Sequence, residues 1–196
     1  MNWPNRLTLG RLALTILFVF SLSSVWTYGR SMALILFALA GISDYLDGEI
    51  ARRSGTVTKF GKLMDPLVDK VMISAAFICL VPLEAVPAWV ATIVVARDFL
   101  ITGLRLLASS EGAILPAERL GKHKTSWQIV TVVFFLLLLS ARELRPGIED
   151  TGWWQIAWRY GGNLLLWFTV GLTIYSGLGY FWRHRALIKD PALGEL

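Results

Sequence analysis

The chain has 196 residues, of which 55% are hydrophobic and only 17% charged, and its mean hydropathy is +0.57. Soluble domains carry about 25% charged residues, so this composition favours a membrane protein. The net charge of +5 does not point to nucleic acid, because no basic helix or base-stacking motif accompanies it and cytoplasmic Lys and Arg explain it equally well.

Six apolar segments are long enough to cross a bilayer, which requires about 20 apolar residues per helix. In chain order they are residues 8–26, 32–52, 64–82, 87–107, 124–141 and 162–182. We therefore predict an all-α fold in which residues 1–196 form one polytopic membrane domain of six transmembrane helices. A short N-terminal interfacial segment is expected to precede them, and the first segment is too long for a cleaved signal peptide.

The distribution of Lys and Arg predicts the orientation of these helices. If the N-terminus is cytoplasmic, 13 of these residues lie on that side, whereas Arg30, Arg142, Arg145 and Arg159 lie on the other. This asymmetry favours both termini inside the cell. The connection 142–160 holds three of the exceptions and several Trp residues, so we expect an interfacial helix on the outer membrane surface.

Four aspartates lie at the facing ends of the second and third apolar segments. A carboxylate at membrane depth is energetically costly and rarely persists without a function. Residues three and four apart share a helix face, so two stripes are expected to face each other across the basic turn 53–60. The first stripe comprises Asp44, Asp47, Gly48 and Ala51, and the second comprises Gly61, Asp65 and Asp69.

Carboxylates gathered in this way repel one another unless cations lie among them. Oxygen ligands without Cys or His suit Mg²⁺ or Mn²⁺. The small residues leave room for a bulky ligand, and Arg52 and Lys62 are placed to meet phosphate. A divalent-metal or proton transporter is the alternative from another class, although transporter sites are expected near the midplane of the bilayer.

The run Asp44-x-x-Asp47-Gly48-x-x-Ala51-Arg52, followed after residues 53–60 by Gly61-x-x-x-Asp65-x-x-x-Asp69, resembles the signature of the CDP-alcohol phosphatidyltransferase family. Every signature position and the spacer length are matched. The resemblance implies a six-helix membrane enzyme, usually a homodimer, with its active site at the cytoplasmic face. Such enzymes transfer a phosphatidyl group from CDP-diacylglycerol to an alcohol and release CMP.

The resemblance also implies individual roles. It makes Asp44, Asp47, Asp65 and Asp69 the ligands of Mg²⁺ or Mn²⁺, with two ions expected, and makes Asp69 the general base as well. The residues that it places against the nucleotide of CDP-diacylglycerol are Asn5, Thr8, Gly48, Ala51, Arg52, Thr58 and Gly61.

Other segments are similar to the branch of this family that makes phosphatidylglycerophosphate. These segments are Trp3–Arg11, Leu63–Lys70, Arg97–Arg105 and Leu120–Thr125, and the similarity implies sn-glycerol 3-phosphate as the acceptor. Arg97 and Arg105 share a helix face about two turns apart, and Lys122 and Lys124 approach from the same side. We expect these four residues to bind the acceptor phosphate.

Several alternatives remain open from the sequence. Arg105, Lys122 and Lys124 also fit ordinary cytoplasmic positive charges, and Arg97 could pair with Asp98 or with an aspartate of the signature. The acceptor could be inositol phosphate, serine or phosphatidylglycerol, and a non-catalytic relative of the family is a further possibility. The expected location is the bacterial inner membrane.

Overall fold

The computed structural model describes the backbone of residues 3–54, 59–110 and 119–183 and the side chains of residues 9–43, 67–68, 70–106, 108 and 123–183. Its elements are α1 (Trp3–Ser23), α2 (Gly29–Ser54), α3 (Lys59–Leu80), α4 (Ala88–Ser110), α5 (Arg119–Leu144), the 3-10 turn η1 (Ile148–Asp150), α6 (Gly152–Ile156), the π-helical turn η2 (Ala157–Gly161) and α7 (Gly162–Arg183). The described chain contains no strand, which confirms the all-α fold class. Each of the six predicted apolar segments forms a helix.

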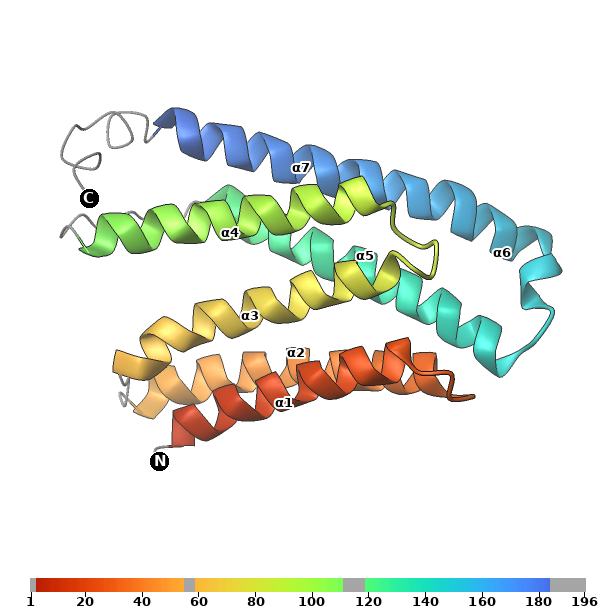
Figure 1. Cartoon of the computed structure of the whole chain (residues 1–196), viewed down its shortest axis with the longest axis horizontal. Helices are drawn as coiled ribbons and strands as arrows, with labels where there is room; N and C mark the ends of the chain where they lie inside the picture. The colour runs from red at the N-terminus through yellow and green to blue at the C-terminus, as the bar shows by residue number, and fades with distance from the viewer. Residues whose placement is uncertain (1–2, 55–58, 111–118, 184–196) are drawn as a thin grey trace.

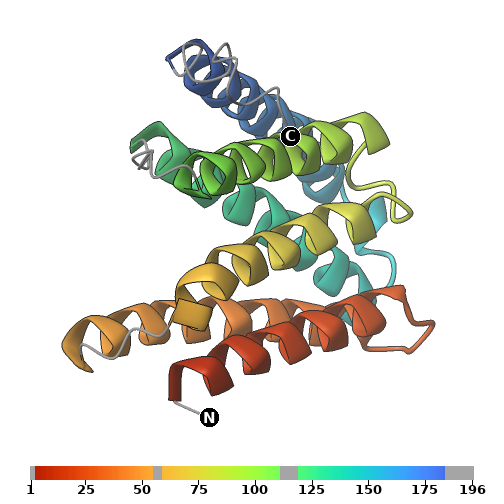
Figure 2. The same ribbon diagram turned by 60° about the vertical axis from the view of Figure 1, so that its left-hand side comes forward.

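The helices run back and forth along one long axis, and α1 begins at the same end of the bundle at which α7 ends (Figure 1). One side of the bundle consists of α1, α2 and α3, with α1 packed against both of the others (Figure 2). The other side consists of α4, α5 and α7. Because α5 contacts both α2 and α7, it joins the two sides.

Aromatic and aliphatic side chains fill the space between the helices. Phe18, Phe37, Phe77 and Phe135 come from four different helices and are each at most 3% exposed, and the ring centroids of Phe18 and Phe37 lie 5.7 Å apart. The outer surface is also apolar and exposes many large side chains, such as Phe20, Leu164 and Trp182. Contiguous apolar surface of this kind is unusual in a soluble monomer, so it suits contact with lipid.

Two helices of the described chain are long and apolar enough to cross a membrane by themselves, His123–Leu144 and the continuous helix Gly152–Arg183. Shorter apolar stretches occupy Leu9–Ser23, Gly29–Ser43 and Lys70–Leu80. These lengths are compatible with a membrane protein, whereas the six crossings stay a prediction. The expected N-terminal interfacial segment is helical from Trp3 and continuous with α1.

The connection 142–160 contains the expected helix, which is continuous with the last predicted apolar segment, and its place at the outer membrane surface stays a prediction. α5 continues to Leu144, and the helix that begins at Gly152 passes through η2 directly into α7. The rings of Trp154 and Trp158 stack with centroids 5.0 Å apart, and Trp158 lies edge-on to Phe135 of α5 at 5.5 Å. These Trp side chains therefore hold the continuous helix against α5.

Two glycines explain why this helix does not break at the start of the predicted last span. A Cβ added at Gly162 would lie 2.9 Å from Cζ of Phe135, and one added at Gly161 would lie 3.1 Å from Cζ of Phe134. The glycines thus allow the backbone to approach α5 closely. The π-helical turn η2 contains one residue more per hydrogen-bonded turn than an α-helix, and the helix continues through it without interruption.

The N-terminus of α2 is capped by a side chain from α5. The backbone N–H groups of Arg30 and Ser31 donate to the two carboxylate oxygens of Glu143 at 3.0 and 2.8 Å, and the Ser31 hydroxyl donates to Oε2 at 2.7 Å. The first N–H groups of a helix have no partner within it and form the positive end of its dipole. The Glu143 carboxylate satisfies them and fixes α2 to α5.

We predict that Glu143→Gln lowers the free energy of unfolding by about 1.5–3 kcal/mol, the range for hydrogen bonds to a charged group. The amide keeps the shape of the side chain but loses the negative charge and one acceptor oxygen. Thermal unfolding of the detergent-solubilised protein measures the effect. Glu84→Gln, at an exposed position in the α3–α4 connection, is the control, and equal melting of the two variants would contradict the prediction.

Candidate functional site

The structure confirms the helices that carry the four aspartates. Asp44 and Asp47 belong to α2, and Asp65 and Asp69 belong to α3. Their side chains lie outside the described part of the chain, as do the side chains of Asn5, Thr8, Ala51, Arg52 and Lys122 and the surroundings of Gly48 and Gly61, while Thr58 lies outside entirely. Among the side chains that are described, no group of three or more His, Cys, Asp or Glu could hold a metal. The aspartate metal site therefore stays a prediction.

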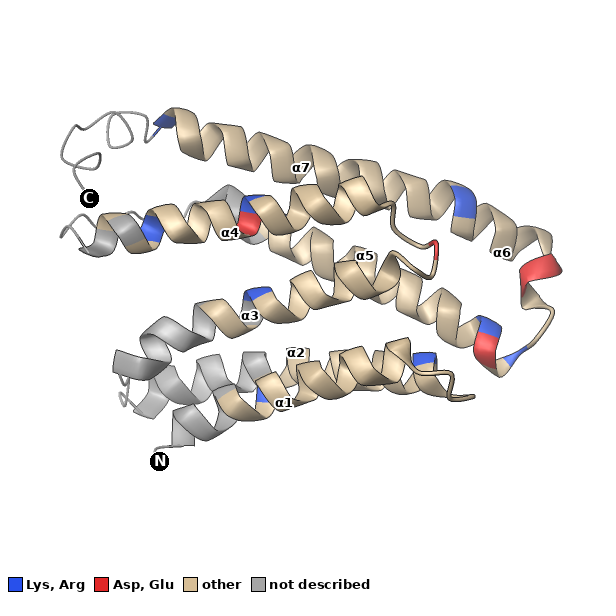
Figure 3. Ribbon diagram, viewed as in Figure 1, with Lys and Arg blue, Asp and Glu red and all other residues tan. Residues whose placement is uncertain are grey.

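The helix segments that carry the aspartates lie at the end of the bundle where α2 ends, α3 begins and both α4 and α7 end (Figure 1). In Figure 3, many of the described charged residues lie toward the end of the bundle where α5 meets α6, and others lie part-way along α3 and α4. Arg97 and Asp98 belong to α4 and Lys124 to α5. Within the described part of the chain these three form a buried charged cluster.

The Asp98 carboxylate is the centre of this cluster. Its Oδ1 accepts hydrogen bonds from Nη1 of Arg97 at 3.3 Å and from Nζ of Lys124. The side chains of Arg97, Asp98 and Lys124 are only 16%, 7% and 3% exposed. Because Arg97 and Asp98 are neighbours on α4 while Lys124 comes from α5, the carboxylate ties these two helices together.

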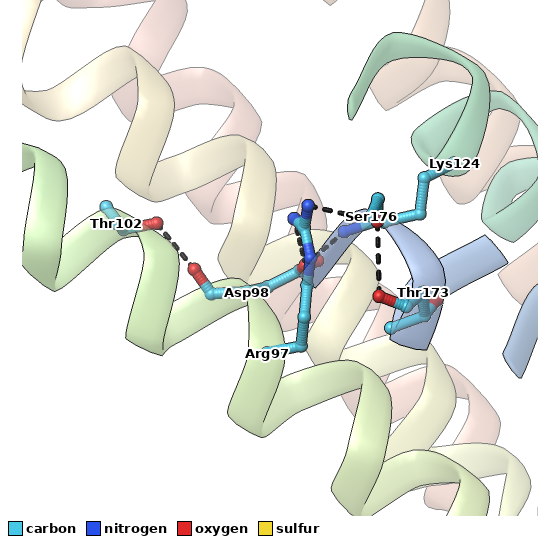
Figure 4. A network of polar contacts seen from close by, with 6 residues as sticks. All are labelled: Arg97, Asp98, Thr102, Lys124, Thr173 and Ser176. Atoms are coloured by element: carbon cyan, nitrogen blue, oxygen red, sulfur yellow. Dashed lines mark hydrogen bonds and ion pairs between the residues drawn. The ribbon is translucent and has the colours of Figure 1, made fainter. Parts of the chain in front are cut away.

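A third helix contributes to the cluster through hydroxyl groups (Figure 4). Nη2 of Arg97 donates to the Ser176 hydroxyl of α7 at 3.1 Å, and that hydroxyl donates to the backbone carbonyl of Thr173 at 3.1 Å. On α4 the Thr102 hydroxyl donates to the backbone carbonyl of Asp98 at 2.6 Å. The network therefore joins α4, α5 and α7 at one level of the bundle.

The cluster carries more positive than negative charge. Arg97 and Lys124 bring two cations to the single carboxylate of Asp98, which leaves one positive charge in excess among these buried groups. Lys70 of α3 is close enough to Lys124 for their charges to interact, and it directly follows Asp69 in the sequence. The basic cluster thus adjoins the helix segment that carries Asp69. A buried positive charge that is not compensated within the cluster is stabilised by an anion.

Two of the four residues predicted to bind an acceptor phosphate are brought together. Arg97 and Lys124 meet at Asp98, whereas Arg105 is exposed near the end of α4. The pairing of Arg97 with Asp98 was one of the alternatives that the sequence left open. Sequence reasoning missed Ser176 as a partner of Arg97, and the signal available was a small polar residue within the apolar segment 162–182.

An apolar groove lies elsewhere in the bundle, between the C-terminal end of α3 and the N-terminal half of α4. Its volume is about 460 Å³, and Ile78, Val81, Ala88 and Ala91 are among its lining residues. The Thr92 hydroxyl in its wall donates to the backbone carbonyl of Ala88 at 2.9 Å. The groove offers no charged group for phosphate or metal chemistry, so the charged cluster is the candidate site.

Comparison with known proteins gives consistent matches over most of the chain. The model of a family described as CDP-alcohol phosphatidyltransferase matches residues 1–175. A CDP-diacylglycerol–glycerol-3-phosphate 3-phosphatidyltransferase of Bacillus subtilis is 35% identical over 96% of this chain and 97% of its own length. The enzyme of that name from Rickettsia felis is 32% identical over 92% of this chain and 93% of its own length. A probable phosphatidylglycerophosphate synthase of Mycobacterium tuberculosis is 38% identical over 71% of this chain and 68% of its own length.

We predict that Asp98→Asn destabilises the protein more than Lys124→Met does. Without the carboxylate, two buried cations face each other, and breaking a buried pair in this way costs about 3 kcal/mol or more. Without Lys124, Arg97 and Asp98 still neutralise each other. Unfolding in detergent measures both variants against Arg105→Met, which removes an exposed charge from α4. Equal losses for the two buried positions would show that Asp98 is not the centre of the cluster.

Proposed function

Because the chain belongs to the CDP-alcohol phosphatidyltransferase family, we propose that it is an enzyme that transfers the phosphatidyl group of CDP-diacylglycerol to sn-glycerol 3-phosphate. The products are phosphatidylglycerophosphate and CMP. The relatives named for this reaction support the proposal at 32–35% identity over more than nine-tenths of the chain. The structural observation that supports the choice of acceptor is the excess of positive charge among the described buried groups Arg97, Asp98 and Lys124.

A phosphorylated acceptor suits this cluster on electrostatic grounds. Arg97 and Lys124 are held in the interior of the bundle with one carboxylate between them, and a phosphate monoester would compensate the remaining positive charge. Arg binds phosphate through a planar fork, and Lys binds it as a compact point charge. Arg105 and Lys122 complete the proposed acceptor-phosphate site from the same end of α4 and α5. The cluster favours glycerol 3-phosphate over an acceptor without phosphate, such as serine.

The nucleotide end of CDP-diacylglycerol is proposed to lie against α1, α2 and α3. Small residues there leave room for the cytidine diphosphate, and Arg52 binds its negatively charged phosphates. The full proposed set is Asn5, Thr8, Gly48, Ala51, Arg52, Thr58 and Gly61. The apolar outer surface of the bundle allows the acyl chains to stay in the bilayer while the soluble acceptor arrives from the aqueous phase.

Family members generally depend on a divalent metal ion, and the donor set of this chain fits such an ion. Asp44, Asp47, Asp65 and Asp69 offer only carboxylate oxygens from two helices that succeed each other at one end of the bundle, and oxygen donors of this kind suit Mg²⁺ or Mn²⁺ rather than zinc. We propose two ions. When bound, they would neutralise the pyrophosphate and stabilise the departing CMP.

The residues of the chain then perform three tasks. Arg97 and Lys124 bind the acceptor phosphate and hold its free hydroxyl toward α3. Asp69 accepts the proton of that hydroxyl as the oxygen attacks the phosphorus of the phosphatidyl group. A new phosphorus–oxygen bond forms, the bond to the phosphate of CMP breaks, and CMP leaves with the bonding electrons. The apolar surroundings limit the access of water, which would otherwise compete as a nucleophile.

We also propose the cellular setting of this reaction. Both termini and the active site would face the cytoplasm of a bacterial inner membrane, as the distribution of Lys and Arg favours. The protein would act as a homodimer, as the family resemblance implies. Two helices long enough to span a membrane and the apolar exterior support a membrane location.

The purified protein in mixed micelles should release CMP from CDP-diacylglycerol when glycerol 3-phosphate is supplied with Mg²⁺ or Mn²⁺. Inositol phosphate, serine and phosphatidylglycerol serve as comparison acceptors, and a sample with a metal chelator should lose activity. CMP and the lipid product are both measured. Faster turnover with any comparison acceptor would overturn the proposed acceptor while keeping the chemistry.

We expect Asp69→Asn to abolish CMP release while CDP-diacylglycerol binding is largely retained, because the amide cannot take the proton from the acceptor. Single-turnover assays and equilibrium binding of the lipid nucleotide separate the two effects. Asp150→Asn, at an exposed position in η1, is the matched control. Substantial residual turnover by Asp69→Asn would show that Asp69 is not the general base.

A further inference from the structure

The side chain of Arg97 crosses from α4 to α7 and is held there by two consecutive residues. Its Nη2 donates to the Ser176 hydroxyl at 3.1 Å. Its aliphatic stem lies against Gly177, where an added Cβ would be 3.2 Å from Cγ and 3.9 Å from Nε of Arg97. Ser176 and Gly177 are both buried. α7 therefore contacts Arg97 along the stem and at one terminal nitrogen.

The Ser176 hydroxyl is oriented before it meets the guanidinium. It donates its own hydrogen to the backbone carbonyl of Thr173 at 3.1 Å, so only its lone pairs are left for Arg97. A hydroxyl carries one donor and two acceptor positions. The contact with Arg97 thus uses Ser176 as an acceptor of fixed direction.

Gly177 differs from its neighbours on the same helix. At Gly171 and Gly179 an added Cβ would meet nothing within 4 Å, whereas at Gly177 it would press on the Arg97 stem. The lack of a side chain at this one position lets the stem lie close to the α7 backbone. A side chain there would require the Arg97 stem to shift by a few tenths of an ångström.

We propose that Ser176 and Gly177 are positioning residues for the acceptor-phosphate site and act through Arg97, an inference that rests on the proposed function. Asp98 holds Nη1 of Arg97 and Ser176 holds Nη2, which fixes the plane of the guanidinium. Each of these nitrogens carries a second N–H, and the direction of those two donors is thereby set. Gly177 sets how far the fork extends from α4.

The test compares Gly177→Ala and Ser176→Ala with Gly179→Ala, which makes the same chemical change as Gly177→Ala two residues along the same helix. Michaelis constants for glycerol 3-phosphate and for CDP-diacylglycerol and the kcat are measured for each variant on material that elutes as a single folded species. Wild type and Gly179→Ala should behave alike.

We expect the KM for glycerol 3-phosphate to rise about tenfold in Ser176→Ala, which corresponds to the loss of one hydrogen bond from a charged group. Gly177→Ala should raise the same constant severalfold, because the methyl group displaces the stem. The KM for CDP-diacylglycerol should stay near that of wild type in both variants. This separation between the two substrates distinguishes positioning of Arg97 from a general loss of structure.

Two results would overturn the inference. One is turnover of glycerol 3-phosphate in which Gly177→Ala and Ser176→Ala both keep the wild-type KM for the acceptor. The other is an equal change in the constants for both substrates, which would indicate a structural effect. A wild-type protein that releases no CMP with glycerol 3-phosphate would instead overturn the proposed function, and this inference with it.

Discussion

The buried carboxylate of Asp98 is the interaction on which the arrangement of α4, α5 and α7 depends. It accepts hydrogen bonds from Arg97 of its own helix and Lys124 of α5, and Arg97 extends the network to Ser176 of α7. An unpaired charge in the interior of a bundle is costly, and a paired one is stable only when its hydrogen bonds are satisfied. The three helices are therefore constrained to meet at this level.

The two sides of the bundle also differ in the charge that they carry. One side, α1 to α3, carries the aspartate signature, and the other side, α4 to α7, carries the excess of positive charge. Lys70, one residue after Asp69, interacts electrostatically with Lys124 across the boundary. A reaction between a lipid nucleotide and an anionic acceptor requires sites of both kinds close together, and this arrangement supports the proposed transfer.

Much of the fold was predictable because long apolar segments in a membrane-type composition have few alternatives to the helix. All six predicted segments are helical, and their bounds agree within three residues except that α1, α3 and α5 each begin five residues earlier than predicted. In the connection 142–160, the sequence did not reveal that the helix beginning at Gly152 runs unbroken into the last predicted segment, and the reason is tertiary. Gly161 and Gly162 pack against Phe134 and Phe135. This contact lies between two helices, so the sequence of one helix does not reveal it.

The sequence by itself determined the aspartate signature, the family and the oxygen-rich donor set, because the spacing of residues within one helix is written in the chain. It also identified Arg97 and Lys124 as candidates. Only the tertiary structure decided that these two cations meet at Asp98, that Arg105 is exposed, and that Ser176 and Gly177 hold Arg97. Contacts between helices depend on which faces pack together, and no spacing within a single segment specifies that choice.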